Sequence, residues 1–386
     1  ILDGVTGVQT CALPISYDRK HWKILLQELF PSDLDFFVQE EGLHSSKNER
    51  IESFTQFGNI SLSDRFSSKL ALFEVRLKPR TTKLHINRVA LREIVDKMRR
   101  DTAITGALAV FVDEELGKWR FTFIAKADVF GEKTVETTDP KRYTYVLGKG
   151  ERTRTAEDRF KLLASKAQKS LEDIIEAFSV EKVNAEFFKK YKELYNTCWQ
   201  YLAQPESGAY EVFKINPKIA DDRARKPLRD FAKRLMGRLV FLYFLQKKGW
   251  MGCPMHAEDW EGGNPDFVAQ LFNGLSLDQK TRFYSDYLTQ LFFRTLNERR
   301  TQDAFILPNG EKVRVPYLNG GLFDSDEPGT DVFDFPVEWF VQVFDFFSQY
   351  NFTIDESSPN DQEIGIDPEM LGHIFENLLE ENREKG

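Results

Sequence analysis

The spacing of hydrophobic residues changes along the chain, and the first change lies near residue 58. Residues 21–30 carry apolar side chains every three to four positions, as one face of a helix requires, and Pro31 ends this pattern. Residues 58–62 instead alternate between apolar and polar positions, and residues 70–77 form an apolar run with the length of a strand. We therefore expect a helix and then a β-hairpin with a long connection.

A second helix and a second strand pair follow the hairpin. Asn87 is a suitable cap for a helix over residues 88–98, whose apolar side chains form one stripe. Residues 107–112 and 119–124 are apolar segments on either side of an acidic turn, which predicts two more strands. The order of these elements predicts an α/β domain with a mixed sheet over residues 17–165.

Beyond this domain the spacing is mainly helical. We expect a helical spacer domain over residues 166–300, then an acidic connection and one last helix over residues 301–386. Residues 301–335 of that connection are rich in Gly, Pro and Asp. The segments with helical spacing are 163–178, 184–202, 227–249, 265–273, 278–299 and 337–350.

The first residues differ in kind from the rest of the chain. Residues 7–16 resemble the translation of a sequencing adapter. A secretory signal is the alternative, but it requires a basic start and a longer apolar run than this segment has. We therefore expect residues 1–16 to be a non-native leader that takes no part in the fold.

Composition indicates a soluble cytoplasmic protein without a membrane anchor. No run of about 18 apolar residues is present, so we expect no membrane span. The three cysteines argue against a disulfide framework and for a reducing compartment. Cys253 and His256 form a single Cys-x-x-His pair, which is too few ligands for a zinc site.

The net charge of −8 is unevenly distributed. Residues 17–170 contain 29 Lys and Arg against 23 Asp and Glu, whereas residues 301–386 contain 4 against 19. Clustered cations supply most of the sequence-independent affinity for duplex DNA. The first 300 residues can therefore offer a surface for double-stranded DNA. The alternative is that the acidic residues only improve solubility.

Candidate chemistry lies on the predicted strand at residues 70–78. Alternation places Glu74, Arg76 and Lys78 on one face of this strand. With Asp64 in the preceding loop, the pattern resembles the Asp…Glu-x-Lys site of the PD-(D/E)xK nuclease fold. In that site two carboxylates hold Mg²⁺ while a lysine orients the attacking water. We therefore expect Asp64 and Glu74 as metal ligands, with Arg76 and Lys78 as further catalytic residues.

Arg76 departs from this pattern because it stands where the fold has lysine. A guanidinium stays protonated and cannot act as a base, although it can stabilise phosphate charge. Glu40 or Glu41, close to the first helix, is a candidate for a further acid. The alternative is a solvent-facing edge strand, with Asp64 as an ordinary turn residue.

Two further arginines are candidates for DNA binding. Arg88 and Arg92 lie one turn apart on the predicted helix at residues 88–98. Side chains in this arrangement can reach DNA phosphates or the carboxylates of the candidate site. The alternative is an ordinary solvated helix face.

Several sequence blocks resemble the large fused restriction-modification enzymes of the type IIG kind. In these enzymes the last block precedes a class I N6-adenine methyltransferase domain, which carries a Phe-Tyr-Thr-Pro motif and an Asn-Pro-Pro-Tyr catalytic loop. Neither motif follows here, so we expect a fragment whose last helix is the first helix of the methyltransferase domain and which ends before the methyltransferase motifs. The blocks are residues 73–75 with 87–92, 234–250, 317–324 and 366–379.

The resemblance implies Mg²⁺-dependent cleavage of double-stranded DNA coupled to adenine methylation, in defence against foreign DNA. S-adenosylmethionine would bind only in the full-length enzyme, and target recognition would also lie in the missing part. The runner-up interpretation is a catalytically inactive DNA-binding or scaffold region of a phage-defence adenine methyltransferase. Arg76 in place of lysine favours this second interpretation.

Overall fold

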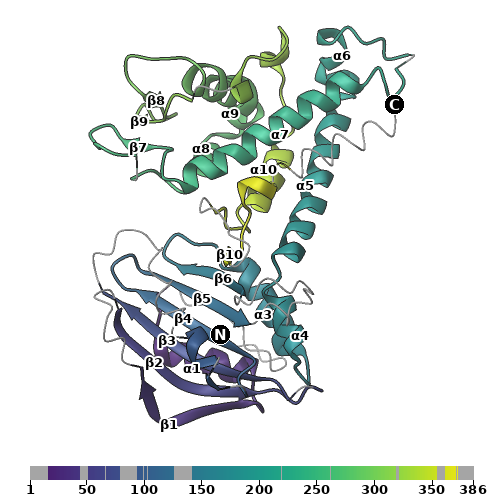
Figure 1. Ribbon diagram of the computed structural model, residues 1–386. Coiled ribbons are helices and arrows are strands. Elements are labelled where there is room, and N and C mark those ends of the chain that lie inside the picture. Colours follow the sequence, from purple (N-terminus) through teal and green to yellow (C-terminus); the bar gives the residue numbers. More distant parts are fainter. Residues whose placement is uncertain are drawn as a thin grey trace, which may run out of the picture. The chain divides into compact units, whose positions relative to one another are not determined.

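The computed structural model divides into two compact units, which are described separately (Figure 1). The first unit comprises residues 1–183, 349–351 and 355–365, and the second comprises residues 184–348, 352–354 and 366–386. The residues that the structure describes are 16–43, 51–65, 67–78, 94–98, 100–101, 103–125, 141–218, 220–260, 262–318, 321–353, 361–370 and 372.

A mixed sheet forms the centre of the first unit, which confirms the predicted mixed α/β class. Within the described residues it has seven strands, of which the pairs β3–β4 and β6–β10 are parallel and the others antiparallel. In order across the sheet the strands are β1 (Leu34–Gly42), β2 (Ile51–Ser61), β3 (Lys69–Leu77), β4 (Gly106–Asp113), β5 (Lys118–Ala125), β6 (Lys141–Gly148) and β10 (Asp361–Glu363).

The elements predicted before residue 125 are present where the structure describes them. The first helix is α1 (Arg19–Leu29), and the side chain of Asp18 caps it by accepting a hydrogen bond from the backbone N–H of His21 at 2.9 Å. The two predicted strand pairs are β2 with β3 and β4 with β5. Residues 94–98 are helical, whereas residues 88–93 lie outside the described residues.

Three strands of this seven-stranded sheet were not predicted, each for a physical reason. β1 contains a bulge between Phe36 and Glu41, which breaks the alternation that identifies a strand. β6 is buried along nearly its whole length, and its buried polar residues Arg142 and Thr144 hide the pattern of a half-exposed strand. β10 has only three residues and pairs with β6, which lies more than 200 positions earlier in the chain.

Different elements cover the two faces of the sheet. Phe73 and Val75 of β3 point to the face that packs against the helical residues 94–98. The opposite face is covered by α1, α3 (Arg154–Ser165) and α4 (Leu171–Ala177). On that face the ring centroid of Trp22 in α1 lies 4.5 Å from that of Phe121 in β5. Because side chains alternate along β3, Glu74 lies on the same face as α1.

Asn351 connects the returning chain to this unit. Its backbone lies far from β6 in sequence, yet its side-chain Oδ1 accepts a hydrogen bond from the N–H of Arg152 at 2.7 Å. Its Nδ2 donates to the carbonyl of Val146 at 3.2 Å and to that of Arg152 at 3.1 Å. These three bonds fix the chain just before β10 adds to the edge of the sheet.

Helices dominate the second unit, as the spacing predicts. The segment predicted at 278–299 forms π-helix rather than α-helix for most of its length. In a small sheet with the order β7–β9–β8, β8 and β9 come from the predicted connection and β7 comes from the region predicted as a helical spacer. The elements are α5 (Val180–Leu202), η3 (Pro205–Ser207), α6 (Ala209–Val212), α7 (Lys226–Lys247), β7 (Cys253–Pro254), α8 (Phe267–Asn273), α9 (Leu277–Thr281), η4 (Phe283–Leu288), η5 (Gln290–Leu296), β8 (Ala304–Ile306), β9 (Lys312–Arg314), η6 (Gly321–Phe323), η7 (Thr330–Val332) and α10 (Val337–Phe347).

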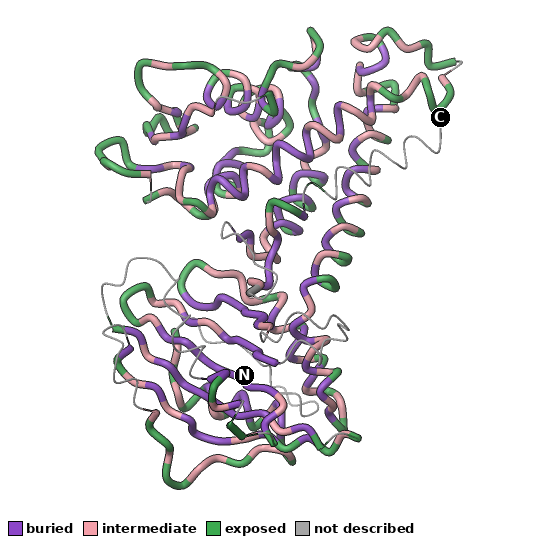
Figure 2. Tube along the Cα trace, viewed as in Figure 1, coloured by how far each residue is buried: buried purple, intermediate pink, exposed green. Residues whose placement is uncertain are grey.

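In both units the buried residues lie mainly in the helices and strands (Figure 2). The inner strands β3, β4 and β5 are buried along most of their length. In the second unit α7 is buried over much of its surface, and Phe340 and Phe344 of α10 pack against Phe272. None of the helices that the structure describes has both the length and the apolar character needed to cross a membrane.

Arg238 of α7 is a buried cation that organises the second unit. Its side chain is 1% exposed and pairs with Asp326, 2% exposed, with 2.5 Å between Nη1 and Oδ2. The same guanidinium donates to the carbonyls of Leu322 at 2.8 Å and Asp324 at 2.7 Å. Arg234, one turn earlier, places its Nε 2.6 Å from the other oxygen of Asp326. Two of the family-like blocks, 234–250 and 317–324, therefore meet at this ion pair.

Candidate functional site

Glu74 lies in the interior of the sheet. β3 is hydrogen-bonded to β2 on one side and to β4 on the other, so the edge-strand alternative is wrong. The Glu74 side chain is only 3% exposed because α1 covers its face of the sheet. A carboxylate in this position needs polar partners to offset the loss of water.

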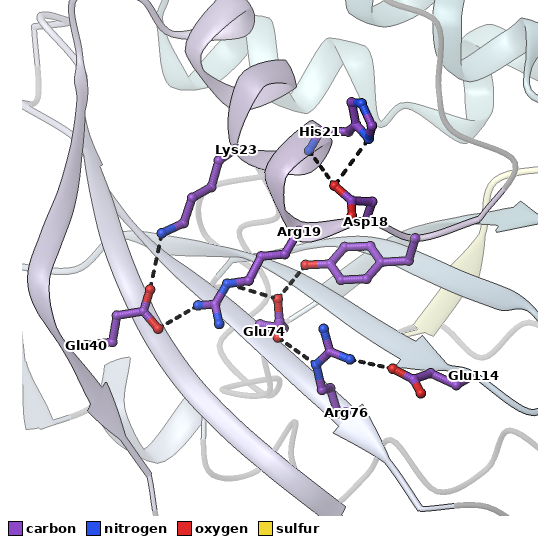
Figure 3. Close-up of polar contacts among 9 residues, drawn as sticks. Asp18, Arg19, His21, Lys23, Glu40, Glu74, Arg76 and Glu114 are labelled. Carbon is purple, nitrogen blue, oxygen red and sulfur yellow. Dashed lines mark hydrogen bonds and ion pairs between the residues drawn. The ribbon is translucent and has the colours of Figure 1, made fainter.

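Three side chains supply those partners (Figure 3). The hydroxyl of Tyr17 donates to Oε2 of Glu74 at 2.5 Å, and Nε of Arg76 donates to Oε1 at 3.0 Å. Nε of Arg19 lies 3.4 Å from Oε2. Tyr17 and Arg19 lie on either side of Asp18, the N-cap of α1, so the start of this helix is placed directly above β3. Both carboxylate oxygens of Glu74 are therefore paired.

A second layer of carboxylates surrounds these arginines. Nη2 of Arg19 lies 2.6 Å from one oxygen of Glu40, and Nζ of Lys23 lies 3.2 Å from the other. Arg76 also forms an ion pair with Glu114, in the turn between β4 and β5. The cluster contains three cations and three anions and is formally neutral: Arg19, Lys23, Arg76, Glu40, Glu74 and Glu114.

The pKa shifts agree with this pairing. Burial raises the pKa of Tyr17, and the charge of Glu74 and the hydrogen bond to it raise it further, so Tyr17 remains a donor. Burial lowers the pKa of Arg76, but the hydrogen bond and charge of Glu74 and the charge of Glu114 outweigh it, and the pKa is raised overall. Arg76 therefore stays charged and cannot act as a base.

Asp64 has a different environment. Its Oδ1 accepts a hydrogen bond from the backbone N–H of Ser68 at 2.9 Å, and its Oδ2 accepts one from the N–H of Leu171 at 3.2 Å. Leu171 is the first residue of α4, so Asp64 closes its own loop and holds the start of a helix. Ser68 lies just before β3, and Glu74 is six positions further on, or roughly 20 Å along an extended strand.

The structure therefore does not bring Asp64 and Glu74 together. The loop folds back toward α4 instead of along β3, and a metal role for the two carboxylates stays a prediction. The carboxylate that converges on Glu74 is Glu40 of β1, through Arg19. Within the described residues, no group of three or more His, Cys, Asp or Glu side chains is placed to hold a metal ion.

The structure describes only some of the other candidate residues. Lys78 directly follows β3 and is exposed. Arg88 and Arg92 lie outside the described residues. The sequence analysis missed Tyr17, Arg19 and Glu114. The only signal for the first two was their position at the start of a helix next to a strand with a buried charge.

Loss of the Asp64 side chain is expected to cost stability rather than chemistry. Asp64→Ala leaves two backbone N–H groups without acceptors, and we expect the free energy of unfolding of the first unit to fall by about 1–2 kcal/mol. Urea unfolding of the chain measures this. Asp113→Ala is the matched control, because Asp113 accepts one such bond, from Leu116 in an exposed turn. Equal stability of Asp64→Ala and wild type would rule out the capping role.

Comparison with known proteins gives one informative similarity. The chain is 31% identical over 183 residues, or 46% of its length, to a Methanocaldococcus jannaschii protein provisionally named a type II restriction enzyme and methyltransferase. The match covers 14% of that relative, so the chain spans only a small part of the relative's length. No family model matches the chain, and no solved structure matches it significantly. The chain is thus similar to part of a restriction-modification enzyme.

Proposed function

We propose that the chain is part of a fused restriction-modification enzyme, and that its first unit contacts double-stranded DNA without cutting it. The similarity to the Methanocaldococcus jannaschii protein supports the first half of this proposal. The complete pairing of Glu74 by Tyr17, Arg19 and Arg76 carries the second half.

A magnesium site has requirements that this cluster does not meet. Mg²⁺ needs carboxylate oxygens with free lone pairs and keeps several waters. Glu74 is 3% exposed, and two guanidinium groups lie against its oxygens. The neutral balance of the cluster gives no excess negative charge to attract a divalent cation. We therefore propose a retained nuclease fold in which these contacts close the Glu74 position to a metal ion.

The positive balance of residues 17–170 supports contact with duplex DNA. Their 29 Lys and Arg exceed their 23 Asp and Glu, although several of the cations are used within the cluster described above. For the whole enzyme we propose adenine-N6 methylation of DNA with S-adenosylmethionine, in defence against foreign DNA. The family-like blocks at 234–250 and 366–379 support this assignment.

A second candidate function is Mg²⁺-dependent DNA cleavage, the leading interpretation of the sequence. One observation favours it: a single guanidinium, that of Arg19, contacts both Glu40 and Glu74. Two carboxylates that share one cation are close enough to share another. In this proposal Glu40 and Glu74 would hold Mg²⁺, with Glu40 in place of Asp64 as the partner acid.

A cleavage assay with the full-length enzyme separates the two functions. We expect unmethylated duplex DNA with Mg²⁺ to stay intact, while S-adenosylmethionine supports methylation of adenine. Cleavage that is lost in Glu74→Gln and Glu40→Gln would instead establish the second candidate. Asp64→Asn tests the metal pair predicted from the sequence, and Glu52→Gln, at an exposed position of β2, is the control.

A further inference from the structure

A solvent-open cavity of about 430 Å³ lies in the second unit, and its lining includes neither Arg238 nor Asp326. Its walls come from the end of α7, the loop after β7, and the segments that follow η5 and β9. Aromatic and cationic side chains are prominent among them. The lining residues are Trp250, Trp260, Arg299, Arg300, Asp303, Pro316, Tyr317 and Leu318.

Each of the three aromatic rings in this lining has a cation over it. Such contacts hold a ring and a positive charge in a fixed relation. They are also the pairs that stack on bases and contact phosphates in proteins that bind single strands. The pairs, with distances from the cation to the ring centroid, are Lys248 with Trp250 at 4.1 Å, Arg314 with Trp260 at 4.1 Å, and Arg299 with Tyr317 at 5.9 Å.

Two of the arginines are held by backbone carbonyls rather than by carboxylates. Arg314 donates to the carbonyl of Asp259 at 3.1 Å. Arg300 donates to the carbonyls of Thr295 and Val315, both at 2.9 Å. A carbonyl fixes the direction of a guanidinium but does not cancel its charge. The positive charge at these two positions therefore adds to the electrostatic field of the cavity, where Asp303 offsets part of the charge of Arg300.

The charge of the cavity selects the class of ligand. Of the described residues that line it, Arg299 and Arg300 are cations and Asp303 is the acid, and Lys248 and Arg314 add positive charge over the rings. A cationic ligand is disfavoured here, although aromatic rings alone would accept one. The combination suits a flat aromatic ligand that carries negative charge.

We propose that this cavity binds a nucleobase and its neighbouring phosphate within a single strand of DNA. A base stacks on Trp260 or Trp250, and the arginines contact the backbone. A base within a duplex is already stacked on both sides and offers no free face, so the ligand is an unpaired strand. This site is separate from the Glu74 cluster and does not depend on whether that cluster cuts DNA.

The test is fluorescence anisotropy of the whole chain with a labelled single strand of roughly 20 nucleotides, longer than the site of one binding module. Trp260→Leu is expected to weaken binding by about ten-fold, because loss of one stacked base has an effect of that size. Trp260→Phe keeps a ring and is expected to retain most of the affinity. Trp199→Leu is the matched control, since Trp199 also pairs with an arginine, Arg229, outside this cavity.

Several outcomes would overturn the proposal. Unchanged affinity in both Trp260→Leu and Arg299→Gln would show that the cavity binds no strand. Equal losses in Trp260→Leu and Trp199→Leu would assign the effect to general destabilisation. Complete competition by dAMP at the concentration of the strand would make the ligand a free nucleotide. A matched duplex, tested in parallel, is expected to bind Trp260→Leu as it binds wild type, and an equal loss there would overturn the specificity for unpaired bases.

Discussion

Arg238→Ala is expected to lower the free energy of unfolding of the second unit by about 3–5 kcal/mol, the cost of breaking a buried ion pair from one side. The substitution leaves Asp326, 2% exposed, in a low-dielectric interior without its main partner. It also removes the donors of the carbonyls of Leu322 and Asp324. Hydrogen exchange of peptides from α7 and from residues 321–332 locates the loss.

Two further variants test this explanation. Lys226→Ala removes an exposed ion pair with Asp230 on the same helix, and we expect a loss below about 1 kcal/mol. Arg238→Met combined with Asp326→Leu removes both charges and is expected to recover much of the stability, since an apolar pair of similar volume carries no desolvation cost. If Arg238→Ala unfolds no more easily than Lys226→Ala, the ion pair does not hold residues 321–327 in place.

Glu74→Ala is expected to lower the free energy of unfolding of the first unit by about 2–4 kcal/mol, as expected for a buried partner of charged groups. The range is below that for Arg238 because Arg19 and Arg76 are about one-third exposed and keep some hydration. Urea unfolding gives the total, and hydrogen exchange in β3 and α1 locates it. Glu115→Ala, in the exposed turn before β5, is the control.

A loss of stability in Glu74→Ala is expected under both proposed functions, because in each of them Glu74 pairs with Arg19 and Arg76 before any metal binds. The cleavage assay on the full-length enzyme is therefore the experiment that separates the two functions.

Alternation along single strands was enough to predict the placement of Glu74. Because side chains alternate with a period of two, Glu74 and Phe73 were placed on opposite faces of β3. The largely apolar segments at 107–112 and 119–124 predicted the strands β4 and β5 that follow it in the sheet. The partners of Glu74 were harder to predict. Arg19 and Tyr17 reach it from a helix more than 50 positions away, and no local pattern encodes how that helix crosses the sheet.

Asp64 shows why spacing along the chain does not fix which side chains meet. Ten positions separate Asp64 from Glu74, a spacing that suits two ligands of one metal only if the loop turns along β3. The loop instead closes on Ser68, and Asp64 holds the start of α4, which lies about 100 residues later. The contact between Arg238 and residues 322–326 also could not be predicted. The blocks 234–250 and 317–324 were recognisable in the sequence, but nothing in the sequence indicated that they contact each other.

The late position of strand β10 in the chain affects how the protein folds during synthesis and where the chain can be truncated. The edge of β6 stays open until residues 361–363 have left the ribosome, so the sheet cannot be completed while only the first 200 residues exist. An open edge of this kind invites pairing with other chains. A truncation placed at the boundary near residue 183 would keep that edge permanently bare. Supplying residues 349–365 as a separate peptide is a direct way to restore it.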